Sequence, residues 1–488
     1  MRALTIAASL CAAASLAVAS GIATADADDA TPAPTASASP SASAPATAAP
    51  TASASASPSL LGPTTGTSVA CPVAPAALSA AQSAEVLQVA ARRLASAAVG
   101  SSRRYPFGAL TNQTSYARTG PAAWTSGFYP GELWLMVQAT QDDRWLRRAR
   151  SYSAALIPVA NDRSTHDLGF MVGVPMSLAT DLEPGPGRRR SYLNAEITAA
   201  KTLGLRFNPR VGAIKSSVYE GKWGVIVDSA MNAPMLIEVG QALGPEGDLL
   251  VEQGTTHMLT LARTFVRSNG STFHRMAFNP RTGALIGPVA GQGLASTSST
   301  WSRGQAWAIN GFTRAYALTG DARLLQAAEA TANYWLARVP PGCVPAWDLD
   351  VSNDRAPRDS SAAAIAADGL LALAAIEPSA DAAATYRTYA QLTLGTLASP
   401  GWLNTASANP GILLRQSLNV PANPRDGSYV WGDYYLLHAV TSVLAERPTP
   451  SGSPTSTPVP TASQTPGATP AATPGGTAAA TPKPSPTD

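Results

Sequence analysis

Long apolar runs are missing from this 488-residue chain once its first 25 positions are passed. A membrane-spanning helix needs about 20 consecutive apolar residues, so no such helix is expected. The one apolar stretch, ALTIAASLCAAASLAVAS, follows Arg2 and precedes the small-residue triplet ATA at positions 23–25. That order is typical of a secretory signal whose cleavage leaves Asp26 as the first residue. We therefore expect a secreted, extracellular protein with no membrane anchor, and we assign residues 1–25 to a signal peptide.

Cysteine is scarce, with 3 residues in the whole chain, and Cys11 lies in the expected signal. The remaining pair, Cys71 and Cys343, can form no more than one disulfide within the chain. An exported protein meets oxidising conditions, which favour that bond. Two buried free thiols are the alternative, because cysteine is also among the most buried residue types. The sequence leaves both readings open.

Histidine and net charge are low as well. The chain has 4 histidines and a net charge of +3, and its Lys and Arg residues are scattered. No Cys/His spacing fits a metal site, so we expect neither a metal nor another cofactor. No basic stripe is present, which argues against nucleic acid as a partner.

Apolar side chains are rare at both ends. Residues 26–69 and 448–488 consist largely of Ala, Ser, Thr and Pro. Such segments bury too little apolar surface to offset the entropy lost on ordering. We expect a disordered linker, a disordered tail and one folded domain between them at 70–447.

Strand-like alternation is scarce too, and 271–278 (STFHRMAF) is the best candidate. Apolar residues at helical spacing dominate instead. The segments predicted to be helical are 79–98, 131–140, 143–159, 191–205, 232–244, 248–266, 304–320, 322–339, 360–376, 381–398 and 429–446.

The helices recur in pairs. A loop bearing Gly or Asp enters a helix rich in aromatic and small residues. A turn such as TQDDR or TGDAR then leads into a more charged helix. An array of such pairs either remains an open solenoid or closes into a toroid. The loops differ from one another and gather Trp, Tyr, His and Asp, which favours a closed toroid around a carbohydrate site.

Several distinctive blocks occur in one order along the domain: WTSGFYPGELW (124–134), HDLGFM (166–171), VIVDSAMNAPML (225–236), NGSTFH (269–274), STWSRGQAWAINGF (299–312), VPAWDLD (344–350), PRDSSAAAIAADGLLAL (357–373) and GDYYLLHA (432–439). Together these blocks resemble the unsaturated glucuronyl hydrolases of glycoside hydrolase family 88. The resemblance implies an all-α (α/α)6 barrel. It also implies removal of a 4,5-unsaturated uronic acid from the non-reducing end of lyase-generated oligosaccharides, which would be the partners of this enzyme.

Asp228 has two readings. Because it precedes a helical pattern, it suits a helix N-cap, and caps outnumber catalytic acids. Its apolar neighbours would also disfavour the ionised carboxylate and raise its pKa, as a general acid requires. The residues alone favour the cap, whereas the resemblance implies that Asp228 is the proton donor.

Asp167 is the second carboxylate, and its structural alternative is a loop-to-helix cap. By resemblance it lies beside the acid and orients the sugar. Two carboxylates that share a site push their pKa values apart, so that one can stay protonated. The implied chemistry is hydration of an enol ether. The acid protonates C4, water adds at C5, and the hemiketal opens to release the rest of the saccharide.

The resemblance assigns further residues to substrate binding. Indoles can stack on sugar faces, and a guanidinium can pair with a uronate carboxylate. Core packing is the alternative for Trp307, and His257 and His438 are expected to be structural. The substrate-binding set is Trp124, His166, His274, Gln292, Trp301, Arg303 and Trp307.

Three other functions compete with this prediction. An unsaturated rhamnogalacturonyl hydrolase acting on pectin fragments would share the barrel, but HDLGF and STWSRGQAW argue against it. A degenerate barrel that only binds sugar is disfavoured because both Asp167 and Asp228 are present. A protein-interaction solenoid would have repeats that are more alike. The segment LASTSST before Trp301 departs from the acidic pair that the family usually has there.

Overall fold

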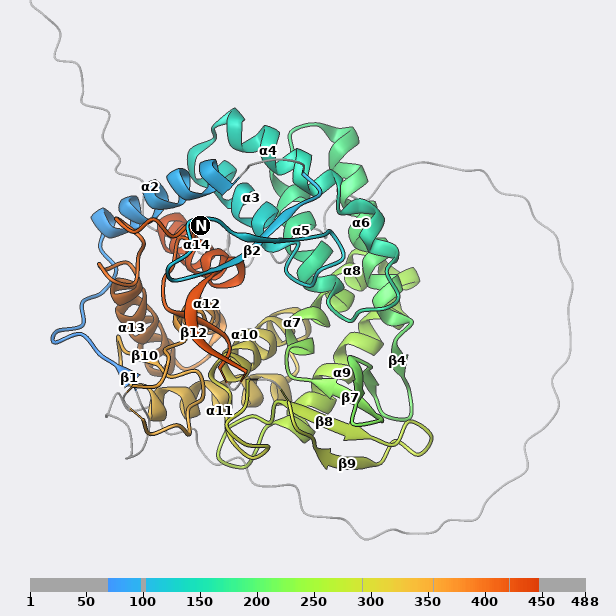
Figure 1. Cartoon of the computed structure of the whole chain (residues 1–488). Helices are drawn as coiled ribbons and strands as arrows, with labels where there is room; N and C mark the ends of the chain where they lie inside the picture. Colours follow the sequence, from blue (N-terminus) through green and yellow to red (C-terminus); the bar gives the residue numbers. More distant parts are fainter. Residues whose placement is uncertain (1–68, 98–101, 292, 354, 421, 447–488) are drawn as a thin grey trace, which may run out of the picture. The chain divides into compact units, whose positions relative to one another are not determined.

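The computed structural model describes residues 69–97, 102–291, 293–353, 355–420 and 422–446 (Figure 1). The expected signal, linker and tail, together with Gln292, lie outside these residues. By its contacts the chain divides into Met1–Arg447 and Pro448–Asp488, and every element described below belongs to the first unit.

The described helices form pairs, each with an inner and an outer member. The inner helices are α3 (Phe128–Thr140), α5 (Val174–Leu182), α8 (Pro234–Leu243) with the short α7 (Ser229–Asn232) before it, α10 (Ser302–Thr319), α12 (Ser360–Ile376) and α14 (Val430–Glu446). Their outer partners are α4 (Asp143–Ala154), α6 (Pro186–Gly204), α9 (Asp248–Phe265), α11 (Ala322–Arg338), α13 (Ala380–Leu397) and α2 (Ala80–Ala97).

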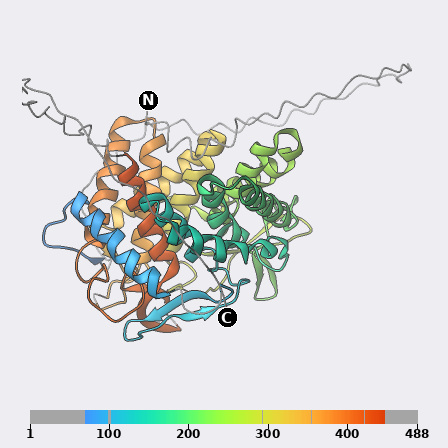
Figure 2. The same cartoon turned by 90° about the horizontal axis from the view of Figure 1, so that it is seen from above.

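The inner helices close into a ring. Going round the ring, α3 contacts α5, the turn η3 (Gly169–Gly173) contacts both α5 and α7, and α7 contacts α10. Then α10 contacts α12, α12 contacts α14, and α14 returns to α3. The first helix, α2, packs on α14 and so serves as the outer partner of the last. Figure 1 shows the ring face-on, and Figure 2, which is turned by 90°, shows its helices lying alongside one another. The domain is therefore an (α/α)6 barrel, as expected, and an open solenoid is excluded.

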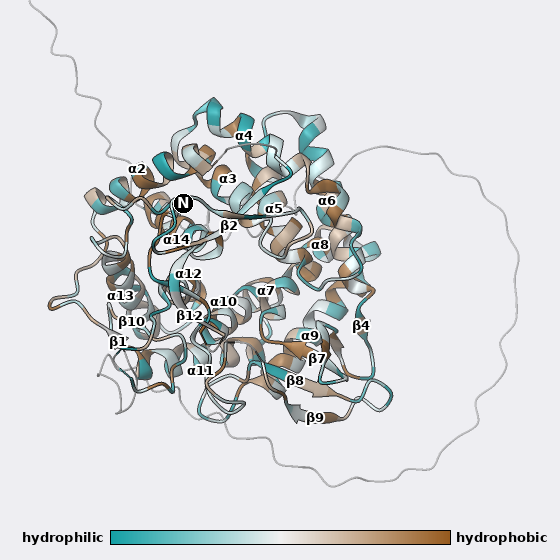
Figure 3. Cartoon of the chain, viewed as in Figure 1, coloured by the Kyte–Doolittle hydropathy of each residue, from teal (hydrophilic) through white to brown (hydrophobic). Residues whose placement is uncertain are grey.

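Burial explains which helices are inner. Most residues of α12, which is rich in Ala, are buried, so it can pack against neighbours on all sides. Outer α4 instead buries a stripe that contains Trp145, Ala149 and Tyr152 and leaves Arg144 and Arg147 exposed, and its ribbon carries hydrophilic as well as hydrophobic colours in Figure 3. The turn before α4 is capped, because the carboxylate of Asp142 accepts a 2.8 Å bond from the backbone of Arg144.

Strands are more frequent than the sequence predicted. One antiparallel sheet has the order β11–β12–β2–β3, and another has the order β6–β7–β8–β9. Their strands are too short to show a clear period of two, and several contain Gly or Pro. The bounds are β2 (Tyr105–Leu110), β3 (Ala117–Thr119), β6 (Ser217–Tyr219), β7 (Lys222–Ile226), β8 (Arg275–Phe278), β9 (Leu285–Pro288), β11 (Gln416–Asn419) and β12 (Asn423–Tyr429).

The strand predicted at 271–278 is confirmed in its second half by β8. Helix α5 was not predicted, because glycines and a proline obscure its period. The remaining elements are β1 (Val69–Ala70), η2 (Ile157–Asn161), η3 (Gly169–Gly173), β4 (Phe207–Asn208), β5 (Ala213–Ile214), η4 (Gly244–Gly247) and β10 (Val344–Pro345). Among the described helices, none is both long enough and apolar enough to cross a bilayer.

A disulfide joins Cys71 to Cys343, which settles the choice between a bond and two free thiols. The bond lies beside the pairing of β1 with β10, in which Ala70 faces Val344. It encloses a long loop, because the two cysteines are 272 positions apart. The bond thus ties the N-terminal edge of the domain to a loop that precedes α12.

Replacing both cysteines by serine should lower the free energy of unfolding by about 2–4 kcal/mol, because the unfolded chain regains the freedom that the cross-link removes. Thermal melts of the parent and of the Cys71→Ser, Cys343→Ser chain would measure the loss. Reductant should lower the melting temperature of the parent but leave that of the double variant unchanged. Equal melting temperatures for the oxidised and reduced parent would contradict the expectation.

Candidate active site

Asp228 lies between the end of β7 at Ile226 and the start of α7 at Ser229. The register of the sheet places Ile226 opposite Arg275, and the backbone N–H of Val227 donates to the carbonyl of His274 at 2.9 Å. Ser229 then begins α7, and its hydroxyl donates to the carbonyl of Ile226 at 2.6 Å. These bonds fix the backbone on both sides of the aspartate, so its position is set by the strand and the helix together.

The side chain of Asp228 does not cap α7. It makes no capping bond to the helix backbone, and its Oδ2 is buried without a hydrogen-bond partner. The N-cap reading is therefore wrong. Burial, reinforced by the nearby charge of Asp167, raises the pKa of Asp228 to about 7, although Arg303 and Arg275 oppose the shift. A side-chain exposure of 16% leaves the group within reach of a ligand.

Asp167 precedes η3, a single π-helical turn, and such turns are frequent at functional sites. Its carboxylate accepts a bond from the hydroxyl of Thr165 at 3.1 Å, and the same hydroxyl accepts from the backbone N–H of Asp167 at 3.0 Å. The bonds that this carboxylate accepts in the described residues come from the side chains of Thr165 and Asn232 and not from the backbone of η3, so it does not act as a helix cap. The side chain of Asp167 is 18% exposed.

Asn232 connects the two aspartates. Its Nδ2 lies 3.3 Å from the carbonyl oxygen of Asp228 and 3.5 Å from Oδ1 of Asp167. Its Oδ1 accepts a 2.9 Å bond from the backbone N–H of Phe170. Gly169 permits this approach, because a Cβ at that position would lie 2.6 Å from the Cα of Asn232. Asn232 and Asp167, which are 65 positions apart in sequence, are thereby held together.

Two neutral imidazoles face the carboxylates. His274 Nε2 lies 4.0 Å from Asp228 Oδ2, and His166 Nε2 lies 3.5 Å from Asp167 Oδ1. Burial lowers the pKa of both histidines, and for His274 the charges of Arg275 and Arg303 add to the effect. Within the described residues, neither nitrogen of His274 has a hydrogen-bond partner, and both nitrogens are buried. The His274 ring lies over Trp301, with centroids 4.4 Å apart.

Arg303 is placed differently from the expectation. Its guanidinium donates to Asp359 at 2.8 Å, to the carbonyl of Leu418 at 2.9 Å, and to the carbonyl of Ser417. The side chain is only 4% exposed, and it lies against the face of Trp301. Arg303 is therefore held by protein acceptors and joins α10 to Asp359 and β11, which favours a structural role. Its pairing with a uronate carboxylate stays a prediction.

An Arg303→Lys chain should lose about 1–3 kcal/mol of unfolding free energy, because an ammonium cannot satisfy these spread acceptors. Turnover per folded molecule should stay close to that of the parent, since the positive charge is kept. Thermal melts and rates corrected for folded fraction would test this, with exposed Arg281→Lys as the matched control. An unchanged melting temperature with lost turnover would restore the direct role in binding.

The remaining predicted indoles lie in one aromatic cluster. Trp307 is fully buried between Phe170 and Tyr435, with ring centroids 5.1 and 5.2 Å away. No part of the side chain is exposed, which favours the alternative of core packing, and its part in substrate binding stays a prediction. Trp124 is partly exposed, and its ring centroid lies 5.0 Å from that of Trp431. Trp124 stays a candidate for contact with a sugar ring.

His257 and His438 are structural, as predicted. His257 is buried, and its Nδ1 accepts from the backbone of Ile214 at 3.0 Å, so its Nε2 carries the proton toward Ser229 Oγ at 3.0 Å. Burial lowers the pKa of His257 to about 3. His438 pairs with Asp368 at 2.6 Å on the inner helices α14 and α12.

Sequence reasoning missed Asn232, Tyr219 and Arg275. Asn232 follows Asp228 by four positions, so helical spacing could have placed it near the site. Arg275 directly follows His274, and its guanidinium lies 4.4 Å from the ring of Tyr219. No local sequence pattern indicates that Tyr219 and Arg275 are neighbours, because β6 and β8 lie on either side of β7 only in the folded sheet.

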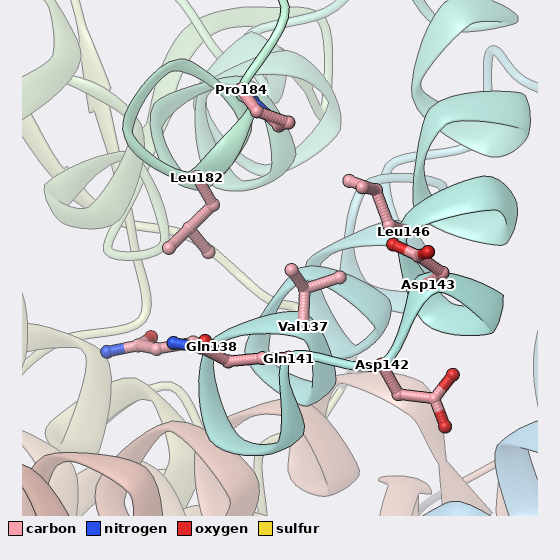
Figure 4. Close-up of a pocket in the computed structure, with 8 residues that line it drawn as sticks. All are labelled: Val137, Gln138, Gln141, Asp142, Asp143, Leu146, Leu182 and Pro184. Atoms are coloured by element: carbon pink, nitrogen blue, oxygen red, sulfur yellow. The ribbon is translucent and has the colours of Figure 1, made fainter. Parts of the chain in front are cut away.

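The cavity of Figure 4 is separate from these residues. It measures about 360 Å³ and lies where α3 and α5 end, whereas Asp167 precedes α5. In the described residues no group of three or more His, Cys, Asp or Glu side chains is arranged to hold a metal ion. The lining residues of the cavity are Val137, Gln138, Gln141, Asp142, Asp143, Leu146, Leu182 and Pro184.

No family model matches the chain. It is 35% identical to an unsaturated glucuronyl hydrolase of Formosa agariphila over 327 residues, which is 65% of this chain and 79% of the relative. It is 30% identical to an unsaturated chondroitin disaccharide hydrolase of Streptococcus pneumoniae, over 65% of this chain and 81% of that relative.

Solved structures resemble the fold. An unsaturated glucuronyl hydrolase specific for heparin matches with a TM-score of 0.69 and 28% identity, over 74% of this chain and 96% of that one. A variant of the Streptococcus agalactiae unsaturated glucuronyl hydrolase, complexed with dGlcA-GalNAc6S, matches with a TM-score of 0.64 and 26% identity. That match covers 75% of this chain and 93% of the other.

Proposed function

Because the chain belongs to the unsaturated glucuronyl hydrolases, we propose that it removes a 4,5-unsaturated uronic acid from the non-reducing end of oligosaccharides released by polysaccharide lyases. As a member of that family it is a glycoside hydrolase of unsaturated uronic acid saccharides. The observation that carries the proposal is the carboxyl group of Asp228, which is buried, has no partner at Oδ2, and has a pKa raised to about 7. Such a group is protonated in a slightly acidic medium and partly protonated at neutral pH.

The proposed reaction is hydration of the enol ether. Asp228 transfers its proton to C4, and the positive charge that develops at C5 is shared with the ring oxygen. Water adds to C5, and its spare proton returns to the Asp228 carboxylate, which restores the acid. The C5 hemiketal then opens to a ketone by breaking the bond from C5 to the ring oxygen. The hemiacetal left at C1 releases the remaining saccharide as an alcohol.

Asp167 serves this reaction through charge and hydrogen bonding. Its negative charge helps to keep Asp228 protonated, and its oxygens can accept from sugar hydroxyls. His274 is neutral and unpartnered, so it can bond to the sugar without repelling a proton donor. We propose contacts to the sugar from His166 and Trp124 as well, and Gln292 keeps its predicted role.

The substrates proposed are unsaturated disaccharides of the glycosaminoglycan type, supported by relatives whose names refer to chondroitin disaccharides and heparin. The decisive experiment mixes the protein with such disaccharides and follows the ultraviolet absorbance of the conjugated enol acid. Absorbance should fall as the double bond is hydrated. Constant absorbance with every unsaturated uronide would refute the proposal, and loss with unsaturated rhamnogalacturonides alone would favour the pectin alternative.

We also propose that the enzyme acts outside the cell. The support is the composition of residues 1–25, which is typical of a secretory signal. N-terminal sequencing of protein recovered from culture medium should begin at Asp26. Full-length chain confined to the cell would contradict secretion.

A further inference from the structure

A second cavity lies beside the sheet that contains β11 and β12, and three arginines line it. Its volume of about 560 Å³ is typical of pockets that hold a small ligand. Arg355 and Arg358 come from the loop that precedes α12, and Arg415 directly precedes β11. The other polar side chains that line the cavity are those of Thr111 and Asp426. We call this cavity the arginine pocket and define it by these five residues.

The backbone around the arginine pocket is fixed by bonds to neighbouring elements. The hydroxyl of Ser417, in β11, donates to the carbonyl of Arg358 at 2.7 Å. The backbone N–H of Ser360, the first residue of α12, donates to the carbonyl of Arg415 at 3.1 Å. The fold itself therefore holds the walls of the pocket in place, as a preformed binding site requires.

Arg415 has an unusual backbone conformation in this wall. Its φ of 59° lies in the left-handed region, which is uncommon for residues other than glycine and recurs at ligand-binding positions. The guanidinium lies over the ring of Trp402, 5.2 Å from the centroid. The side chain is exposed, and within the described residues its nitrogens make no hydrogen bond or ion pair. The face of the guanidinium is thus covered by the indole, whereas its N–H edge can donate to an anion.

The charges around the arginine pocket also favour an anionic ligand. Other arginines at this end of the barrel are paired with carboxylates, as in Arg338 with Asp350 at 2.7 Å and Arg303 with Asp359 at 2.8 Å. Arg415 has no such carboxylate within the described part of the chain. Three positive charges around one cavity repel one another, and an anion bound between them relieves that repulsion.

The remaining lining residues indicate a sugar rather than a bare ion. The carboxylate of Asp426 repels a phosphate or sulfate ion, but it can accept hydrogen bonds from hydroxyl groups. Leu414 and Pro357 add apolar surface, which the C–H faces of a sugar ring can cover. Cations, an acceptor for hydroxyl groups and apolar surface in one pocket suit a sugar that carries an anionic group.

The arginine pocket lies at the same end of the barrel as the candidate acid. Arg358 directly precedes Asp359, which bonds to Arg303 at the start of α10, and Asp228 likewise precedes an inner helix. We propose that the arginine pocket is a second, non-catalytic site that binds an acidic sugar unit of an intact polysaccharide through its sulfate or carboxylate groups. Binding there holds the enzyme on the polymer from which lyases release its substrates. That role, though not the binding itself, rests on the proposed function.

Saturated oligosaccharides test the binding, because they have no unsaturated end for the catalytic site to use. Saturated chondroitin sulfate and hyaluronan oligosaccharides of equal length are titrated calorimetrically into the parent and into Arg355→Gln, Arg415→Gln at low ionic strength. The variant should bind about 10- to 100-fold more weakly, the usual worth of hydrogen bonds to charged groups. Tighter binding of the sulfated chain to the parent identifies the sulfate as the anion bound, and equal binding identifies the carboxylate.

Arg210→Gln, Arg281→Gln is the matched control, because it removes two exposed arginines elsewhere on the surface and should bind like the parent. Melting curves check that each chain is folded. Arg355→Lys, Arg415→Lys keeps the charges and should recover part of the affinity. The proposal is overturned if the parent binds neither oligosaccharide, if the Gln variant binds like the parent, or if the control loses as much affinity. Equal affinity for inorganic sulfate or for a DNA duplex would overturn the assignment to a sugar.

The same variants separate this site from the catalytic one. Arg355→Gln, Arg415→Gln should hydrate a short unsaturated disaccharide at the rate of the parent, since the arginine pocket shares no residue with the candidate active site. A large loss of that rate in the folded variant would contradict a non-catalytic site. Inactivity of the parent on every unsaturated uronide would instead refute the proposed function and leave the titrations with saturated chains unaffected.

Discussion

An Asp228→Asn chain should hydrate unsaturated uronides about 10²–10⁴-fold or more slowly than the parent, because a positioned acid contributes that much to a proton transfer. Asparagine has nearly the same size but cannot deliver the proton to C4. The expected loss lies in kcat, since substrate binding depends on other groups. Steady-state rates on one unsaturated disaccharide would measure it.

The fold should not suffer from this change. In the unfolded chain an aspartate has a pKa of about 3.9, whereas burial raises that of folded Asp228 to about 7. The folded state therefore holds the proton more tightly, which contributes stability at acidic pH that is lost as pH rises through about 7. Above that pH the parent buries a charge that the variant lacks. We expect the variant to melt at or above the temperature of the parent.

Asp321→Asn is the matched control, because this aspartate is 19% exposed and caps α11 far along the chain from the site. Asparagine caps about as well as aspartate, so the control should keep both its stability and its rate. If Asp228→Asn melted early yet turned over normally per folded molecule, Asp228 would be structural. Asp167 would then be the first candidate for the acid.

An Asp167→Asn chain should also lose about 10²-fold or more in rate, because the sugar loses an acceptor and the acid loses a charged neighbour. Its second signature is a shift in pH dependence. In the parent, rates should fall as pH rises through about 7, where Asp228 loses its proton. Without the Asp167 charge the pKa of Asp228 is lower, so the fall should begin at lower pH.

A profile of kcat against pH for both chains would measure the shift. If kcat of Asp167→Asn fell at the same pH as that of the parent, or at a higher pH, the electrostatic link between the two carboxylates would be contradicted. The pH at which kcat falls reflects Asp228 in its full surroundings, so every facing group except Asp167 must be the same in the two chains. The charged and titratable groups around it are Asp167, His166, Tyr219, His274, Arg275 and Arg303.

The barrel was largely predictable because helical spacing is a local signal. The segments at 304–320 and 322–339 correspond closely to α10 and α11, and the TGDAR turn between them holds the cap Asp321. α5 escaped prediction because Gly173 and Pro175 interrupt its period. The short strands were not predicted either, because they are stabilised by pairing with strands that are distant in sequence.

The site was predictable as a set of residues but not as a set of contacts. The resemblance implied catalytic roles for Asp167 and Asp228, and the structure brings both to Asn232. It could not show that Arg303 is held by Asp359 or that Trp307 is enclosed by aromatic rings. Those facts depend on acceptors and rings supplied by other helices and by β11, which no single segment reveals.

By itself the sequence determined the helical pairs and the one cysteine pair, because these follow from spacing and from residue type, whereas the roles predicted for the two carboxylates came from the family resemblance. Only the tertiary structure decided that Asp228 is a buried acid rather than a helix cap. Its pKa depends on burial and on the charges of Asp167, Arg303 and Arg275, which separate segments bring within range. Electrostatic energy depends on distance and on exclusion of water, and both are properties of the folded chain.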